Sequence, residues 1–95
     1  MKVLAIATRN PDADPKQLEK LLQPEADHVL RMIRDETVRE VYSRTDGKGA
    51  VLVLECEDEA HARRLLSELP LAKAGILTVE IYGTKPYRGV VQHVK

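Results

Sequence analysis

The sequence contains no phenylalanine and no tryptophan, and only three tyrosines. Its core must therefore be built from Val, Leu, Ile and Ala, which are small side chains for filling an interior. The length of 95 residues predicts a single domain, spanning residues 1–95. A domain of this size buries only about 60–65% of the surface of its unfolded chain. Because a partner subunit often stabilises so small a core, the composition favours a homodimer.

Three further shortages exclude classes of protein. The single cysteine, Cys56, permits no internal disulfide and no metal site made of cysteines alone. No wholly apolar run is longer than Val3–Ala7, which is too short for a secretion signal or a membrane span. Lys plus Arg equals Asp plus Glu, at 15 each, so no basic field attracts nucleic acid. We expect a cytoplasmic protein that binds neither nucleic acid nor a membrane.

Histidines offer no metal site either. The three in the chain, His28, His61 and His93, lack the spacing of four residues that places two ligands on one helical face. No glycine-rich phosphate loop and no serine nucleophile motif is present. We therefore expect neither a metal nor a cofactor.

The pattern of apolar and turn-forming residues predicts the element order β-α-β-β-α-β. Strands are expected at residues 2–8, 37–44, 50–56 and 77–82. Two helices, at residues 15–22 and 24–35, are expected around Pro24, because a proline inside a helix costs ~3 kcal/mol. In the second of these, Ala26, Val29, Leu30 and Ile33 form the predicted apolar stripe.

The second half of the chain carries clearer boundaries. Asp58 is a plausible N-cap for a helix that Pro70 ends. Beyond the last strand lies a tail of residues 83–95, in which Val90 and Val91 are compatible with a short added strand.

Two crossovers and one hairpin give an α+β, ferredoxin-like subunit, in which a four-stranded antiparallel sheet carries its helices on one face. The last strand divides cleanly between two faces. Leu77, Val79 and Ile81 point one way and belong under the helices, whereas Glu80 and Tyr82 point the other way. A second copy of the chain could cover the helix-free face and close a barrel.

The sequence resembles the dimeric α+β barrel proteins, and among them the muconolactone isomerase type. The residues that carry the likeness are Thr37-Val-Arg39 with Tyr42, the helical segment Asp58–Leu69, Leu69-Pro70-Leu71, and Val79-Glu80-Ile81 with Gly83. The resemblance implies a dimeric α+β barrel, and an isomerase or lyase that needs no cofactor.

Glu80 is the first candidate for a catalytic residue. A carboxylate that faces a closed barrel loses water, which favours its neutral form and suits a general base. The alternative is a structural role, in which Glu80 forms an ion pair with Arg39 or lies at a hydrated edge of the sheet. Arg39 could bind an anionic substrate, since a guanidinium grips a carboxylate through two bonds.

Three more side chains are weaker candidates. Tyr42 and Tyr82 could line the substrate site, although packing in the core or in a subunit interface is the commoner role of a tyrosine. His28, on the longer helix expected at residues 24–35, could reach the end of the sheet and act as an acid or base. A lone helical histidine is more often a surface residue.

Three functions remain open from the sequence. The first is cofactor-free proton transfer on a small organic acid, in the manner of an isomerase or lyase. The second is a non-catalytic module for small-ligand binding or assembly. The third is a monooxygenase-like barrel that acts on an aromatic substrate without a cofactor.

Overall fold

The computed structural model describes the backbone of residues 1–93 and the side chains as far as Val90. Its elements, in chain order, are β1 (Lys2–Arg9), α1 (Pro15–Arg34), β2 (Val38–Ser43), β3 (Gly49–Glu55), α2 (Glu59–Ser67), α3 (Pro70–Lys73), β4 (Leu77–Gly83) and α4 (Arg88–His93). The four predicted strands are confirmed to within one residue at each end, and the antiparallel sheet has the order β2-β3-β1-β4.

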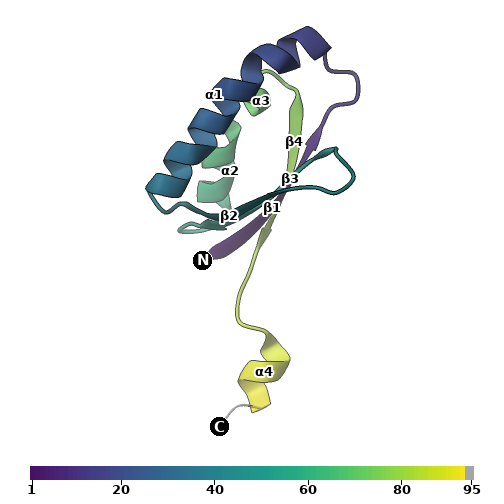
Figure 1. Ribbon diagram of the computed structural model, residues 1–95. Coiled ribbons are helices and arrows are strands. Elements are labelled where there is room, and N and C mark those ends of the chain that lie inside the picture. The colour runs from purple at the N-terminus through teal and green to yellow at the C-terminus, as the bar shows by residue number, and fades with distance from the viewer. Residues whose placement is uncertain (94–95) are drawn as a thin grey trace.

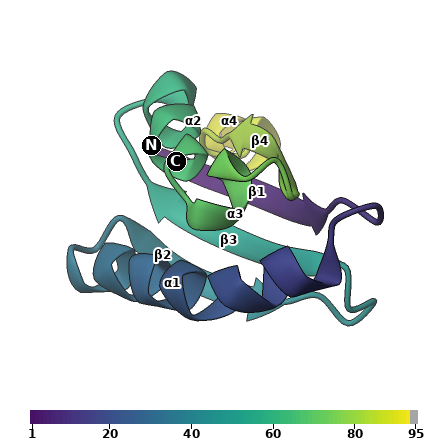
Figure 2. The same cartoon turned by 90° about the horizontal axis from the view of Figure 1, so that it is seen from above.

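The helices cover one face of this sheet (Figure 1). α1 lies along the β2 and β3 half, whereas α2 lies over β4 and β1, and α3 lies between the two helices (Figure 2). The opposite face carries no helix. The predicted ferredoxin-like α+β architecture is therefore confirmed, with β1 and β3 as its central strands.

The core lies between the helices and the sheet. Every second residue of β1 points into it, and Val3, Ala5 and Ala7 are buried. Leu52 and Leu54 do the same from β3, in register with Ala5 and Val3. The helices complete the core with Met32, Ala62, Leu66 and Leu71, together with Leu69, the residue just before α3.

The expected break at Pro24 is wrong, because α1 continues through it from Pro15 to Arg34. Pro24 cannot bond to the carbonyl of Lys20, but both residues are exposed, so water can satisfy that carbonyl. The N-terminal part of the helix bends away from its axis (Figure 1). Asp14 caps the helix at its start, where its side chain accepts a bond from the backbone N–H of Lys16 at 3.0 Å.

The apolar stripe of α1 also differs from the prediction. Leu30 and Ile33 are exposed, whereas Met32 is buried and Val29 packs against the core. Because α1 is one continuous helix, the same face points toward the core from its first turn to its last. That face runs through Leu18 and Leu21 as well.

The C-terminal tail forms a helix and not the expected strand at Val90 and Val91. α4 lies away from the body of the molecule (Figure 1). The last link between the tail and the sheet is Thr84, whose backbone N–H and hydroxyl both donate to the carbonyl of Lys2.

Gly49 offers a test of how closely β1 and β3 approach each other. A Cβ atom on Gly49 would lie 1.9 Å from the backbone oxygen of Ala7. We predict that Gly49→Ala lowers the free energy of unfolding by about 2–3 kcal/mol, because the strands must move apart. Urea denaturation measures the change. The control is Gly47→Asn, at a turn with φ of 73° and no atom within 4 Å of the added Cβ. Equal stability of the two variants would contradict the packing described here.

Candidate functional site

The helix-free face of the sheet holds most of the residues predicted from the sequence. The pairing of the strands places two rows of side chains across it. One row is Tyr42, Val51, Ile6 and Glu80, and the next is Glu40, Val53, Leu4 and Tyr82. Four apolar side chains therefore form the centre of this face, and a glutamate and a tyrosine flank them on each edge strand.

Each edge strand makes the same hydrogen bond. The hydroxyl of Tyr42 donates to Oε1 of Glu40 at 2.8 Å on β2, and the hydroxyl of Tyr82 donates to Oε2 of Glu80 at 2.7 Å on β4. We call these two contacts the edge pairs. The hydrogen bond to the carboxylate raises the pKa of each tyrosine. All four side chains are exposed on this face.

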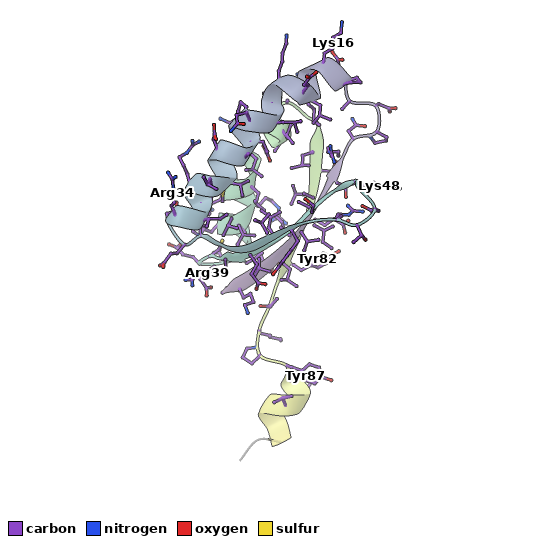
Figure 3. All side chains as sticks on the ribbon, viewed as in Figure 1. Lys16, Arg34, Arg39, Lys48, Tyr82 and Tyr87 are labelled. Carbon is purple, nitrogen blue, oxygen red and sulfur yellow. The ribbon has the colours of Figure 1, made fainter. Side chains whose placement is uncertain are left out.

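Arg39 does not pair with Glu80. It lies at an irregularity in the β2–β3 pairing, where its Nε donates to the carbonyl of Glu36 at 2.8 Å. Arg39 and Tyr82 both lie on the side of the sheet away from α1 (Figure 3). His28 is on α1, on the helical side of the molecule, with its Nδ1 3.5 Å from Nη2 of Arg31. The structure thus brings together Glu80 and Tyr82, but not His28.

A cavity of about 270 Å³ lies on the other side of the sheet, beneath α1. Ala7 of β1 and Ala50 of β3 stand directly opposite each other in its floor. The cavity forms there because two facing alanines leave space under the helix, and the chain has no Phe or Trp to fill it. The remaining lining residues are Arg9, Leu22, Glu25, Val29, Val41, Ser43, Gly49, Leu52, Leu69, Leu71 and Leu77.

Glu25 places a carboxylate in this largely apolar cavity. Its Oε1 accepts a hydrogen bond from the backbone N–H of Leu71 at 2.9 Å. That N–H belongs to the first turn of α3, whose N-cap, Leu69, offers no side-chain bond of its own. Glu25 therefore completes the start of a helix 46 residues away in the chain. Among the residues that the structure describes, Oε2 makes no hydrogen bond.

Burial raises the pKa of Glu25 above its ordinary value of 4.5. The bond from Leu71 and the nearby His28 act in the opposite direction, but loss of water is the larger effect. A carboxyl group of this kind can hold and release a proton closer to neutral pH than an exposed one. Among the described residues, Glu25 contributes the one carboxylate of the cavity lining.

Neither of the two charged residues of the cavity, Arg9 and Glu25, was predicted from the sequence as a site residue. Arg9 follows Val3, Ala5 and Ala7 on the helix-facing side of β1, and its Nη2 donates to the carbonyl of Gly47 at 2.9 Å. Glu25 lies on the inward face of α1, four residues after Leu21 and four before Val29. The sequence predicted two helices separated at Pro24, so Leu21 and Glu25 were assigned to different helices. Their spacing on one helical face was therefore not recognised.

The described residues contain no group of three or more His, Cys, Asp or Glu side chains placed to hold a metal ion. Within residues 1–93, no helix combines the length and the apolar character that crossing a membrane requires.

No protein-family model and no curated protein sequence matches this chain. Solved structures do match it. Muconolactone isomerase superimposes on it with a TM-score of 0.76, at 21% sequence identity, over 93% of this chain and 92% of that chain. The chain has the muconolactone isomerase-like fold.

A second solved structure is similar over almost the whole length. It is the 5-chloro-2-hydroxyhydroquinone dehydrochlorinase from Burkholderia phenoliruptrix, in complex with 2,5-dihydroxybenzoquinone. Its TM-score is 0.67 at 17% identity, over 94% of this chain and 98% of that chain. At these identities the likeness shows the fold alone, and it confirms the resemblance seen in the sequence.

Glu25 makes the stability of the protein depend on pH. Because its pKa is raised on folding, the native chain holds this proton more tightly than the unfolded chain. The resulting stabilisation is complete below pH 4.5, the ordinary value, and is lost as the pH rises through the pKa of the folded state. We predict that Glu25→Gln, which removes this titration, gains stability relative to the natural protein between pH 4 and pH 7.

Urea denaturation at both pH values measures that gain. The control is Glu19→Gln, also on α1 but exposed. A difference between Glu25→Gln and the natural protein that stays constant with pH, or shrinks as the pH rises, would show that burial does not govern this carboxyl group.

Proposed function

We propose that the protein binds a small, largely apolar organic acid in the cavity beneath α1 and transfers a proton on it, with Glu25 as the acid–base group. The observation that carries the proposal is the half-buried carboxylate in a largely apolar cavity, with one oxygen fixed by the N–H of Leu71 and the other without a hydrogen bond among the described residues. A volume of about 270 Å³ is close to the lower end of small-molecule sites, roughly 300–1,000 Å³. It suits a compound the size of a single ring.

Arg9 and Glu25, the two charged residues of the cavity, have different roles in this proposal. Arg9 supplies a cation for the anionic group of the substrate, and Glu25 accepts a proton from a carbon next to a carbonyl. Returning the same proton to a different carbon completes an isomerisation with no net change in atoms or charge. If the electron pair of the broken C–H bond instead forms a double bond while a leaving group departs with its own bonding pair, Glu25 gives the proton to that leaving group or to water, and the reaction is an elimination.

The two similar structures support a substrate of this class. The name of one describes an isomerase of muconolactone, and that of the other a dehydrochlorinase of a chlorinated hydroxyhydroquinone. Both names describe small oxygen-bearing rings. The apolar walls and two charged groups of the present cavity are suited to such compounds.

Turnover by Glu25 variants tests the assignment. A panel of small lactones and quinols, starting with muconolactone and 2,5-dihydroxybenzoquinone, identifies a ligand by calorimetry. For a compound that is turned over, we predict that Glu25→Gln lowers kcat by about 100-fold or more, because acid–base groups contribute at least that much. Its amide oxygen still accepts the Leu71 bond, so binding should change by less than about threefold.

A second variant tests the cavity itself. Val29→Phe adds volume inside the cavity wall and should abolish binding while the fold, checked by circular dichroism, persists. If Glu25→Gln keeps the kcat of the natural protein, or if Val29→Phe binds as tightly as before, the site lies elsewhere.

Glu80 is a second candidate for the acid–base group. The hydrogen bond from Tyr82 and the neighbouring Ile6 favour it, because both would line an enclosed space if a second copy covered this face. Arg39 and Tyr42 would then contact the substrate. We predict that Glu80→Gln lowers kcat by about 100-fold in this case. A kcat within about threefold of the natural value excludes Glu80 from the chemistry.

We also propose a homodimer formed through the helix-free face. Leu4 is 38% exposed at the centre of this face, with Ile6, Val51 and Val53 around it. A small domain gains stability by covering such a surface, and two twisted sheets can pack face to face through their apolar side chains.

A further inference from the structure

α1 carries a second apolar row of side chains, which points away from the core. We call this row the outer stripe, and its members are Leu22, Ala26, Leu30 and Ile33. All four are exposed, Leu22 at 48%, Leu30 at 49% and Ile33 at 42%. Their separations of four, four and three residues bring them into line on one face of the helix. An exposed apolar row along about three turns of a helix indicates a contact surface.

The outer stripe lies on the β2 side of α1. Leu22 lines the cavity together with Val41 of β2, which is itself 37% exposed. The wall of the cavity therefore reaches the surface beside the outer stripe. β2 is an edge strand, and no other element of the described residues lies beyond it (Figure 2). This side of the subunit has room for a second helix.

The outer stripe is complementary to itself when two copies of α1 run antiparallel. A two-fold axis that crosses the helix at Ala26 places each residue opposite one that lies the same number of positions beyond Ala26. Leu22 of one copy then faces Leu30 of the other, because each is four residues from Ala26. Ala26 has the smallest side chain of the outer stripe, and on the axis it lets the two helices approach closely.

The charges at the two ends of the outer stripe fit the same arrangement. Glu19 lies before Leu22 and Arg34 lies after Ile33, and both are exposed. Neither forms an ion pair with another described residue. The antiparallel axis brings Glu19 of one copy beside Arg34 of the other at both ends of the contact. A parallel arrangement would instead place like charges together. The partner that supplies both complementary charges is a second copy of the chain.

We infer that two copies of this chain pair through α1, with their outer stripes packed antiparallel and Glu19 of each copy beside Arg34 of the other. This contact is separate from the helix-free face, and it is independent of the chemistry proposed for Glu25. It covers the side of the cavity at which Leu22 and Val41 are exposed. A chain that has both this contact and the one proposed on the helix-free face forms an assembly larger than a dimer.

Sedimentation equilibrium of the Ile6→Arg variant tests the inference, because an arginine at the centre of the helix-free face prevents pairing through that face. We expect this variant to be a dimer. Adding Leu30→Arg should raise its Kd by at least about 100-fold, since the two-fold axis repeats the loss of each contact. The control is Gln17→Arg, which is exposed on the opposite face of α1 and should leave the Kd within about threefold. Circular dichroism checks the fold of each variant.

An exchange of charges tests the antiparallel order. In the Ile6→Arg variant, Glu19→Arg should raise the Kd by roughly tenfold, because it places two arginines together at each end of the contact. Adding Arg34→Glu should return the Kd to within about threefold of its starting value. In the natural chain, Leu30→Arg alone should reduce the assembly to a dimer.

Each result decides the inference. A monomeric Ile6→Arg variant overturns it and leaves the contact through the helix-free face standing if the natural chain is a dimer. A dimer that tolerates Leu30→Arg overturns it as well, because the copies then meet elsewhere. A dimer that Leu30→Arg dissociates, but that Arg34→Glu does not restore after Glu19→Arg, overturns the antiparallel arrangement. A natural chain that is monomeric overturns both proposed contacts.

Discussion

Alternation of side chains along the two central strands is the constraint on which the rest of this structure depends. Odd-numbered residues of β1 pack under the helices, and the even-numbered residues Leu4 and Ile6 lie on the helix-free face. Because one set is covered within the subunit and the other is not, the two faces of the sheet differ. One face borders the cavity beneath α1, and the other is the helix-free face for which we propose a second copy as partner.

The absence of large aromatic side chains gives the cavity its form. A core made of Val, Leu, Ile and Ala leaves space where Ala7 meets Ala50, and α1 covers that space without filling it. Glu25 then has two roles. It satisfies the backbone N–H of Leu71 and so fixes the wall formed by α3, and it presents a carboxyl group to the interior. The carboxylate of Glu80 is exposed on the helix-free face, and it accepts a hydrogen bond from the hydroxyl of Tyr82 on the same strand.

Local patterns were enough to predict the fold. The strands, the hairpin and the cap at Asp58, whose side chain accepts from the N–H of His61 at 2.7 Å, depend on residues close in the sequence. The helix break at Pro24 was predicted wrongly, because the cost of a proline depends on whether the carbonyl it leaves unpaired can reach water. That carbonyl is at the surface, and this is a property of the folded chain.

The candidate sites were predictable only in part. The repeated Glu-x-Tyr segments are visible in the sequence, and strand parity correctly placed Glu80 and Tyr82 on the helix-free face. The role of Glu25 was not visible, because its partner, the N–H of Leu71, is 46 residues away. Arg9 was missed for a related reason, since the cavity beside it exists only when α1 lies over the sheet.

The pKa of the Glu25 carboxyl group is the most direct test of the account. A pH titration followed by carbon-13 NMR of selectively labelled glutamate, with Glu25→Gln to assign the resonance, measures it in the folded protein. We predict a midpoint above the ordinary value of 4.5, set by burial beneath α1. A midpoint at or below that value would mean that burial is not the dominant influence on this carboxyl group, and would contradict the site proposed for it.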